Sequence, residues 1–282
     1  MNEEYLLHVG ALRVFADFSQ SSCEKFAIAH DNMHPKFGLL RKKYPILETA
    51  GQSSDFEKAL RLMAWVHQNV RHCGGGGEVD LAKDSLAILN YVFGKGRRPG
   101  VFCYHIAIVF TECCLAVGLT ARTIHCKPFS PNDLDTHVVS MVYVSEMDKW
   151  VLFDPNNNAY FTDKQGLPLS PLEVRERLGR EDIQVIGNPQ EEPDWYVQYM
   201  AKNLFYIKFW SRNTFGTDLV EDQKIYYLAP VGFDVRTREI AYREYAIKLN
   251  PPENQKGWKD SLEDFKRQTM ITVSQDEFLQ KA

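Results

Sequence analysis

The stretch Gly100-Val-Phe-Cys103-Tyr-His-Ile-Ala-Ile-Val-Phe-Thr-Glu-Cys-Cys-Leu-Ala-Val-Gly118 decides how the rest of this sequence is interpreted. Its apolar residues recur at steps of three and four, which is the spacing of one buried helix face. Pro99 and Gly100 oppose a helix further upstream and Gly118 is a natural stop, so we expect a helix that begins near Cys103. In the first turn of a helix, unpaired N–H groups and the helix dipole favour an anion and lower the pKa of a thiol.

Three strand-like runs follow this helix. Residues 119–126 are rich in β-forming residues, and residues 136–144 and 150–155 flank a short polar turn, which is typical of an antiparallel hairpin. If Ser145 pairs with Asp148, Asp154 lies opposite Val139, on the same face as His137 and two residues along. Long side chains can meet across that diagonal.

Cys103, His137 and Asp154 therefore form a candidate catalytic triad. A thiol is a poor nucleophile until a base makes it a thiolate, and a carboxylate can orient the histidine that serves as the base. Each residue also has a structural interpretation, since a cysteine in an apolar helix is usually a small buried hydrophobe and Asp-Pro often starts a turn. The order, the spacing and the predicted elements together favour the catalytic interpretation.

The remaining cysteines and a neighbouring histidine fit structural roles. Cys113 and Cys114 lie in the middle of the predicted helix and Cys126 lies in a strand, so all three are predicted to be core residues. Cys23 and Cys73 have no patterned context. His105 is two residues from Cys103 on a helix and points elsewhere, so we interpret it as structural or substrate-facing and not as the base.

These motifs resemble the transglutaminase-like superfamily, in bacterial-type form. The resemblance rests on Gly-x-x-Cys opening a helix, Ala-Val-Gly-Leu-Thr-Ala-Arg122, Thr-His137-Val and Lys-Trp150-Val-Leu-Phe-Asp154-Pro, and it covers roughly residues 56–159. It implies a papain-like Cys–His–Asp triad at Cys103, His137 and Asp154, with Arg122 and Trp150 at framework positions. The implied fold class is α+β, with helices packed on an antiparallel sheet.

Composition limits the other possibilities. The chain has 282 residues, 44% hydrophobic and 25% charged, which is ordinary for a globular protein with a proper core. A net charge of −4 argues against nucleic acid and anionic membranes as partners. Six cysteines without regular spacing and an acidic start without an export signal predict reduced thiols and a cytoplasmic location. We expect no cofactor and no metal, and the Gly74–Gly77 run lacks the Lys-Ser/Thr ending of a phosphate loop.

Outside the motifs, local signals predict further elements. We expect helices near residues 6–18, 56–70 with a Ser53–Asp55 cap cluster, 84–93 capped by Asp84 or Ser85, and 171–178 capped by Ser170. Residues 194–213 suit an amphipathic aromatic helix, residues 224–235 and 239–249 suit a second hairpin, and a short helix follows near residues 262–267. The basic loop that holds Arg97 and Arg98 is either solvated or in contact with a substrate carboxylate.

These elements predict two regions: residues 1–180 as the catalytic core with its N-terminal helices, and residues 181–282 as a C-terminal helix-and-hairpin extension packed on it. The predicted function is cysteine-dependent acyl transfer on a peptide, protein or small amide substrate. Water as the acceptor gives a hydrolase, and an amine gives a transglutaminase or amide synthase; hydrolysis is favoured. A different possibility is a non-catalytic peptide-binding scaffold that retains the triad. The backbone N–H of Cys103 is expected to donate to the oxyanion, a contribution of about 3 kcal/mol, while its second donor is left unassigned.

Overall fold

A computed structural model describes residues 3–74, 81–97, 99–187 and 193–281. The helices are α1 (Glu3–Val14), α2 (Pro35–Lys43), α3 (Ile46–Ala50), α4 (Asp55–Asn69), α5 (Ser85–Gly94), α6 (Cys103–Ala116), α7 (Pro171–Arg180), α8 (Pro193–Asn203), α9 (Val235–Leu249), α10 (Gln255–Arg267) and α11 (Gln275–Phe278). The strands are β1 (Ala29–His30), β2 (Ala121–Lys127), β3 (His137–Val144), β4 (Lys149–Asp154), β5 (Ala159–Thr162), β6 (Gln184–Gly187), β7 (Tyr206–Trp210), β8 (Arg212–Asn213), β9 (Ile225–Leu228) and β10 (Ile271–Val273).

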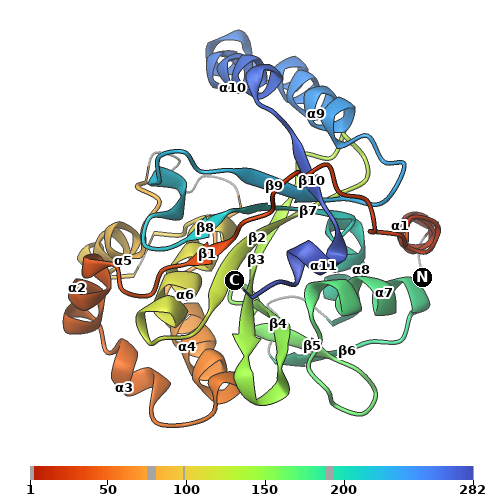
Figure 1. Ribbon diagram of the computed structural model, residues 1–282. Coiled ribbons are helices and arrows are strands. Elements are labelled where there is room, and N and C mark those ends of the chain that lie inside the picture. Colours follow the sequence, from red (N-terminus) through yellow and green to blue (C-terminus); the bar gives the residue numbers. More distant parts are fainter. Residues whose placement is uncertain (1–2, 75–80, 98, 188–192, 282) are drawn as a thin grey trace.

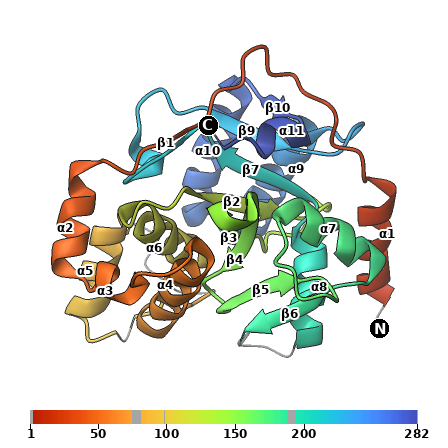
Figure 2. The same ribbon diagram turned by 60° about the horizontal axis from the view of Figure 1, so that its bottom comes forward.

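A mixed sheet is the centre of the molecule. Within the described residues it has eight strands in the order β10-β9-β7-β2-β3-β4-β5-β6, antiparallel except for the β9–β10 pair. Helices α2–α6 lie on one side of the central strands, and α1, α7 and α8 lie on the other (Figures 1 and 2). This mixed architecture confirms the predicted α+β fold class with helices packed on a largely antiparallel sheet.

Apolar side chains on the two faces of the central strands build two apolar cores. Val139 and Met141 of β3 pack with residues of α1, α7, α8 and β7. Val142 and Val144 of the same strand pack with residues of α2–α6. Successive side chains of a strand point to opposite faces, so both faces of β3 are covered by protein.

Helix α6 is buried along its length, from His105 to Ala116. Its one acidic residue, Glu112, accepts hydrogen bonds from the N–H groups of Ser85 (2.9 Å) and Gly216 (2.8 Å). Burial raises the pKa of Glu112 to about 8. The helix ends as predicted before Gly118, which has a φ of +88° that favours glycine. These contacts fix α6 between α5 and the loop after β8, and they thereby fix Cys103 at its start.

Several predicted helix starts are confirmed by the hydrogen bonds of their N-cap side chains. Ser54 accepts a hydrogen bond from the N–H of Glu57 at the start of α4, and Asp84 caps α5 through Ala87. Ser170 forms a reciprocal capping box with Glu173 at the start of α7. The predicted helices at residues 6–18, 84–93 and 171–178 are present with bounds shifted by a few residues.

The predicted second hairpin is wrong. Residues 235–249 form helix α9, and its buried residues Val235, Arg238, Glu239, Tyr242 and Ala246 follow helical spacing. Two of these are charged, so a search for apolar periodicity overlooks the pattern. Glu239 accepts hydrogen bonds from Tyr206 and Arg243, which satisfies its charge inside the fold.

The predicted aromatic helix over residues 194–213 is half correct. Helix α8 ends at Asn203, and Tyr206–Trp210 forms strand β7, which pairs with both β2 and β9. The segment is apolar enough to suit either structure, and the open edge of β2 decides for a strand because its backbone groups need partners.

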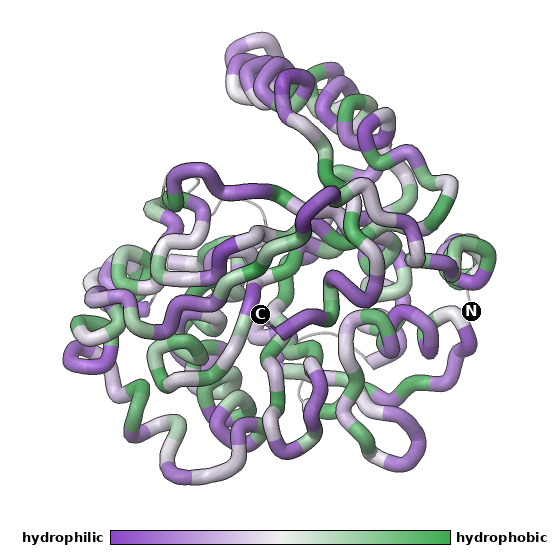
Figure 3. Tube along the Cα trace, in the orientation of Figure 1, coloured by the Kyte–Doolittle hydropathy of each residue, from purple (hydrophilic) through white to green (hydrophobic). Residues whose placement is uncertain are grey.

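Strands β7, β9 and β10 continue the sheet from β2, so the C-terminal region shares one sheet with the predicted core. Beyond the sheet, α9 and α10 project as an arm on which α10 carries mainly hydrophilic residues (Figures 1 and 3). Only Leu262 and Phe265 of α10 are buried. The division at residue 180 stays a prediction.

Framework residues Arg122 and Trp150 hold the C-terminal segment. Arg122 is fully buried and donates to the carbonyl oxygens of Phe278 (2.9 Å) and Gln280 (2.7 Å). The Trp150 indole N–H donates to the carbonyl oxygen of Leu279, and the Arg122 guanidinium lies 4.1 Å from the Trp150 ring centroid. Across the described segments, none of the helices combines the length and apolar character needed to cross a bilayer.

Ending the chain after residue 193 tests whether the core is independent. The truncation removes β7, which covers the edge of β2, and it removes the apolar partners that α8 supplies to the core around Val139. We expect insoluble protein, because an exposed apolar strand edge promotes association between chains. The soluble fraction and the thermal unfolding transition should be compared with those of the full chain. A soluble fragment with a cooperative transition would instead establish residues 1–193 as a separate folding unit.

Candidate active site

The structure brings the three residues of the predicted triad together. Cys103 is the first residue of α6, His137 is the first residue of β3 and Asp154 is the last residue of β4. Helix α6 packs along β3 and β2, which places its N-terminus beside the end of the sheet where His137 and Asp154 lie. His137 and Asp154 are buried, and Cys103 is partly exposed.

The hairpin has the register that the sequence predicts. Ser140 is opposite Phe153 and Val144 is opposite Lys149, so Asp154 is in step with Val139. Asp148 adopts a left-handed conformation (φ 49°) that closes the turn. His137 Nε2 consequently lies 2.6 Å from Asp154 Oδ2. This contact leaves Nδ1 of the ring to face the thiol.

Cys103 is hydrogen-bonded to His137 and to a second histidine, His72. Burial raises the pKa of the Cys103 thiol, but hydrogen bonds from His137 and His72 outweigh it and lower the pKa to about 7. Burial likewise lowers the pKa of His137, but the charge and hydrogen bond of Asp154 outweigh it and raise the pKa to about 10. Between about pH 7 and pH 10, Cys103 is therefore mainly a thiolate and His137 mainly an imidazolium, and the two charges stabilise each other.

Asp154 is held as an anion by groups from three parts of the chain. Its oxygens accept from the backbone N–H groups of Asn156 (3.0 Å) and Asn157 (3.2 Å), from the Asn157 side chain (2.9 Å) and from the Tyr196 hydroxyl (2.8 Å). Burial raises the pKa of this carboxyl, but His137, Asn157 and Tyr196 together lower it below its usual value. A buried carboxylate with this many donors stays charged and fixes the orientation of the His137 ring.

His72 reaches the thiol through a short backbone pairing. His72 and Val101 form a parallel bridge, in which the Cys73 N–H donates to the Val101 carbonyl (2.8 Å) and the Val101 N–H donates to the Arg71 carbonyl (2.9 Å). Gly100 is required there, because a side chain at this position would place its Cβ 2.4 Å from Cys73 Cβ. The pairing holds residues 71–73, in the segment that follows α4, against the residues that lead into α6.

The first turn of α6 gives the site a cluster of hydrogen-bond donors. Phe102 is the N-cap residue and makes no side-chain cap hydrogen bond, so its side chain does not occupy the first N–H groups of the helix. The Val138 N–H and the His72 ring also lie at the thiol. The Cys103 N–H is thus free of a cap partner at the start of the helix, where a backbone donor can stabilise an oxygen that gains negative charge.

Other residues singled out from the sequence lie elsewhere. His105 is buried against the rings of Phe102 (5.9 Å) and Tyr104 (5.9 Å), which agrees with a structural role. Arg97 lies over the Phe93 ring, while Arg98 and residues 75–77 of the glycine run lie outside the described residues. Cys113, Cys114 and Cys126 are buried as predicted.

Two contributors to the site were missed by sequence reasoning. His72 is 31 residues before Cys103, and only its place directly after a predicted helix singles it out. Tyr196 is one of several aromatic residues in its segment, and nothing in its spacing distinguishes a partner of Asp154 from a core residue. Both depend on tertiary packing.

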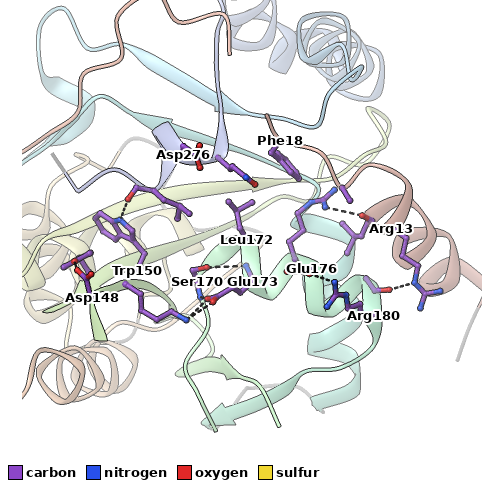
Figure 4. A pocket seen from close by; sticks show the side chains of 18 residues that line it. Arg13, Phe18, Asp148, Trp150, Ser170, Leu172, Glu173, Glu176, Arg180 and Asp276 are labelled. Atoms are coloured by element: carbon purple, nitrogen blue, oxygen red, sulfur yellow. Dashed lines mark hydrogen bonds and ion pairs between the residues drawn. The ribbon is translucent and has the colours of Figure 1, made fainter. Parts of the chain in front are cut away.

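A cavity of about 660 Å³ lies apart from this site, between α1, α7 and α11 (Figure 4). Trp150, Phe18 and Leu172 line it, and its lining includes the ion pairs Lys149–Glu173 (2.7 Å) and Arg180–Glu176 (2.5 Å). None of the triad residues lines it. In the part of the chain that the structure describes, no group of three or more His, Cys, Asp or Glu side chains is arranged to hold a metal ion.

Comparison with known families agrees with the resemblance seen in the sequence. Residues 45–155 match the model of the transglutaminase-like superfamily, and this span contains Cys103, His137 and Asp154. The predicted resemblance is thus confirmed for this segment. No curated protein matches the chain.

Two solved structures match parts of this chain. One is described as a "putative cysteine protease" from Cytophaga hutchinsonii, with 16% identity and a TM-score of 0.33, and the match covers 67% of this chain and 53% of that one. The other is described as a "putative protease" from Parabacteroides distasonis, with 14% identity and a TM-score of 0.28, and the match covers 52% of this chain and 26% of that one. The chain therefore spans about half of the first structure and a quarter of the second.

The electrostatics of the site predict a selective thiol. Cys103 should react with iodoacetamide with a midpoint near pH 7, well below the value of about 8.5 for an ordinary cysteine. His137→Ala and His72→Ala should each raise this midpoint, because each removes a group that stabilises the thiolate, and His137→Ala should raise it more. Mass spectrometry of alkylated peptides across the pH range measures all six thiols in one experiment.

Cys23 serves as the internal control, since it is also partly exposed and burial raises the pKa of its thiol. It should be alkylated only at higher pH, in the parent protein and in both variants. A Cys103 midpoint near that of Cys23, unchanged in the two histidine variants, would contradict the described electrostatics.

Proposed function

We propose that this protein is a cysteine-dependent acyl-transfer enzyme that hydrolyses an amide or peptide bond, and the match of residues 45–155 to the transglutaminase-like superfamily supports this. The observation that carries the proposal is the hydrogen-bonded chain from Cys103 through His137 to Asp154, with a thiol pKa of about 7. A thiolate that is present at neutral pH and partly exposed is suited to attack a carbonyl carbon.

The first half of the reaction forms the acyl-enzyme. The Cys103 thiolate attacks the carbonyl carbon, and the electron pair of the carbonyl bond moves to its oxygen. The Cys103 N–H and His72 stabilise this oxyanion, which is typically worth a factor of about 10² to 10³ per donor. The imidazolium of His137 then gives its Nδ1 proton to the leaving nitrogen, and the C–N bond breaks as the amine departs.

The second half returns the enzyme to its starting state. His137, now neutral, removes a proton from water as the water oxygen attacks the thioester carbon. The C–S bond breaks, the carboxylic acid leaves, and the thiolate and imidazolium are restored. Asp154 stays ionised throughout, because five contacts hold its charge, and it keeps the proton on Nε2 of the histidine.

Replacement of the triad residues tests their roles. Cys103→Ala should abolish turnover and leave the fold intact, because it removes one partly exposed sulfur. His137→Ala should reduce kcat/KM by about 10³-fold or more, since it removes both the base and the acid. Asp154→Asn should retain more activity than His137→Ala, because the imidazole remains and loses only its orienting anion. Peptide libraries followed by kinetics on one selected fluorogenic peptide provide the measurement.

Equal unfolding midpoints in urea would show that each variant is folded. Retained turnover in Cys103→Ala would refute the assignment of the nucleophile. The acceptor is tested in the same assay by adding methylamine and identifying the products by mass spectrometry. Hydrolysis predicts the free acid as the main product, whereas a main product that carries the amine would make the protein a transferase.

A further inference from the structure

Another cavity is lined by residues of α1, of α8 and of the loop before β3. Helices α1 and α8 pack against each other on one side of the sheet (Figure 2). The volume of the cavity is about 280 Å³. The residues that line it are Glu4, Tyr5, His8, Asp135, Trp195, Gln198, Tyr199 and Lys202. We infer that this cavity binds a basic side chain, lysine or arginine, on the leaving-group side of the scissile bond. This inference rests on the proposed function and specifies its substrate class.

The proton transfer from His137 determines on which side of the Cys103 thiol the leaving group lies. In the proposed reaction His137 gives its proton to the leaving nitrogen, so the leaving group must lie on the histidine side of the thiol. Tyr199 lies on that side, with its ring centroid 5.2 Å from that of His137 at an angle of 67°. Tyr199 also lines the cavity, and its hydroxyl donates to Asp135 (3.2 Å). One side chain therefore separates the cavity from the proposed general acid.

An aromatic pair forms one wall. The rings of Trp195 and Tyr199 are stacked, with centroids 4.9 Å apart and planes 11° from parallel. Trp195 is 45% exposed, although most large apolar side chains of α8 are covered. An indole ring that lines a cavity and stays this exposed is well suited to stack on a guanidinium or to attract an ammonium group.

The charges around the wall favour a cation. Lys202 is the basic residue of the lining, and its ammonium group lies over the Tyr199 ring (5.2 Å), which leaves Trp195 as the ring for a bound cation. The ammonium group also lies between Asp135 of the lining (2.8 Å) and the nearby Asp133 (3.0 Å), two carboxylates that together exceed its charge. Burial lowers the pKa of His8, so this ring is neutral at neutral pH. Glu4 adds a further carboxylate to the lining. The cavity thus has a net negative charge next to an aromatic face, which attracts a basic side chain and repels an acidic one.

Matched peptides test this inference through turnover. Pairs of fluorogenic peptides should carry either arginine or citrulline at each of the first three positions after the scissile bond, because citrulline has nearly the same shape without the charge. We expect one position at which arginine raises kcat/KM about 10-fold over citrulline, as one cation–π contact with a neighbouring carboxylate would give. Trp195→Ala and Asp135→Asn should reduce this ratio to less than about 2-fold.

A matched pair of variants on α1 provides the control. Glu4 lines the cavity and Glu3, its neighbour in the first turn, does not. Glu4→Gln should lower the arginine-to-citrulline ratio, and Glu3→Gln should leave it unchanged. Cleavage without any preference for arginine, or a preference that survives Trp195→Ala and Asp135→Asn, would overturn the inference while the proposed function stands.

Binding tests the cavity independently of turnover. Calorimetric titration of the Cys103→Ala protein with acetyl-arginine amide and acetyl-citrulline amide should show binding of the arginine compound alone, and Trp195→Ala should abolish it. This result would support the cavity even if no peptide were cleaved, in which case the proposed function alone would fail. Equal binding of the two compounds, or of neither, would overturn the inference whatever the activity.

Discussion

The hydrogen bond between His137 and Asp154 is the contact on which the rest of the site depends. Both side chains are buried, and a charge removed from water is costly unless other groups replace its hydration. Here the turn after β4 supplies two N–H groups and the Asn157 amide, and α8 supplies the Tyr196 hydroxyl. The C-terminal region is therefore tied to the site by chemistry as well as by the shared sheet.

The same contact sets the state of the thiol. Asp154 stabilises the proton on His137, the resulting imidazolium stabilises the Cys103 thiolate, and His72 adds a second hydrogen bond. Cys103 is the first residue of α6, so its sulfur lies at the positive end of the helix dipole. This position further stabilises the thiolate. Three parts of the chain thus act on the Cys103 sulfur: the β3–β4 hairpin, His72 in the segment after α4, and the start of α6.

Much of the site could be predicted because its information is local. The start of α6 follows from Pro99, Gly100 and an apolar period, and the hairpin register follows from a short polar turn. Those two features are enough to place Cys103, His137 and Asp154 at one end of the sheet. Residues joined only by the packing of separate elements, such as His72 and Tyr196, leave no comparable pattern in the sequence.

The errors in the C-terminal region have related causes. The buried face of α9 includes Arg238 and Glu239, whose charges are satisfied only by partners such as Tyr206 and Arg243. Apolar periodicity cannot identify a helix face that contains charged residues. The β-forming residues of this segment then favour a strand, although it folds as a helix. Strand β7 pairs with the edge of β2, and this edge exists only in the assembled sheet. The local sequence of residues 206–210 therefore does not distinguish a strand from a helix.

The activity proposed for Cys103 depends on the buried pair of His137 and Asp154, and the protonation state of His137 shows whether that pair is charged. Nitrogen-15 NMR of histidine-labelled protein near pH 8 distinguishes an imidazolium, with both ring nitrogens protonated, from either neutral tautomer. We expect an imidazolium at His137 that persists to about pH 10, together with a thiolate at Cys103. A neutral His137 ring beside a protonated thiol at that pH would contradict it.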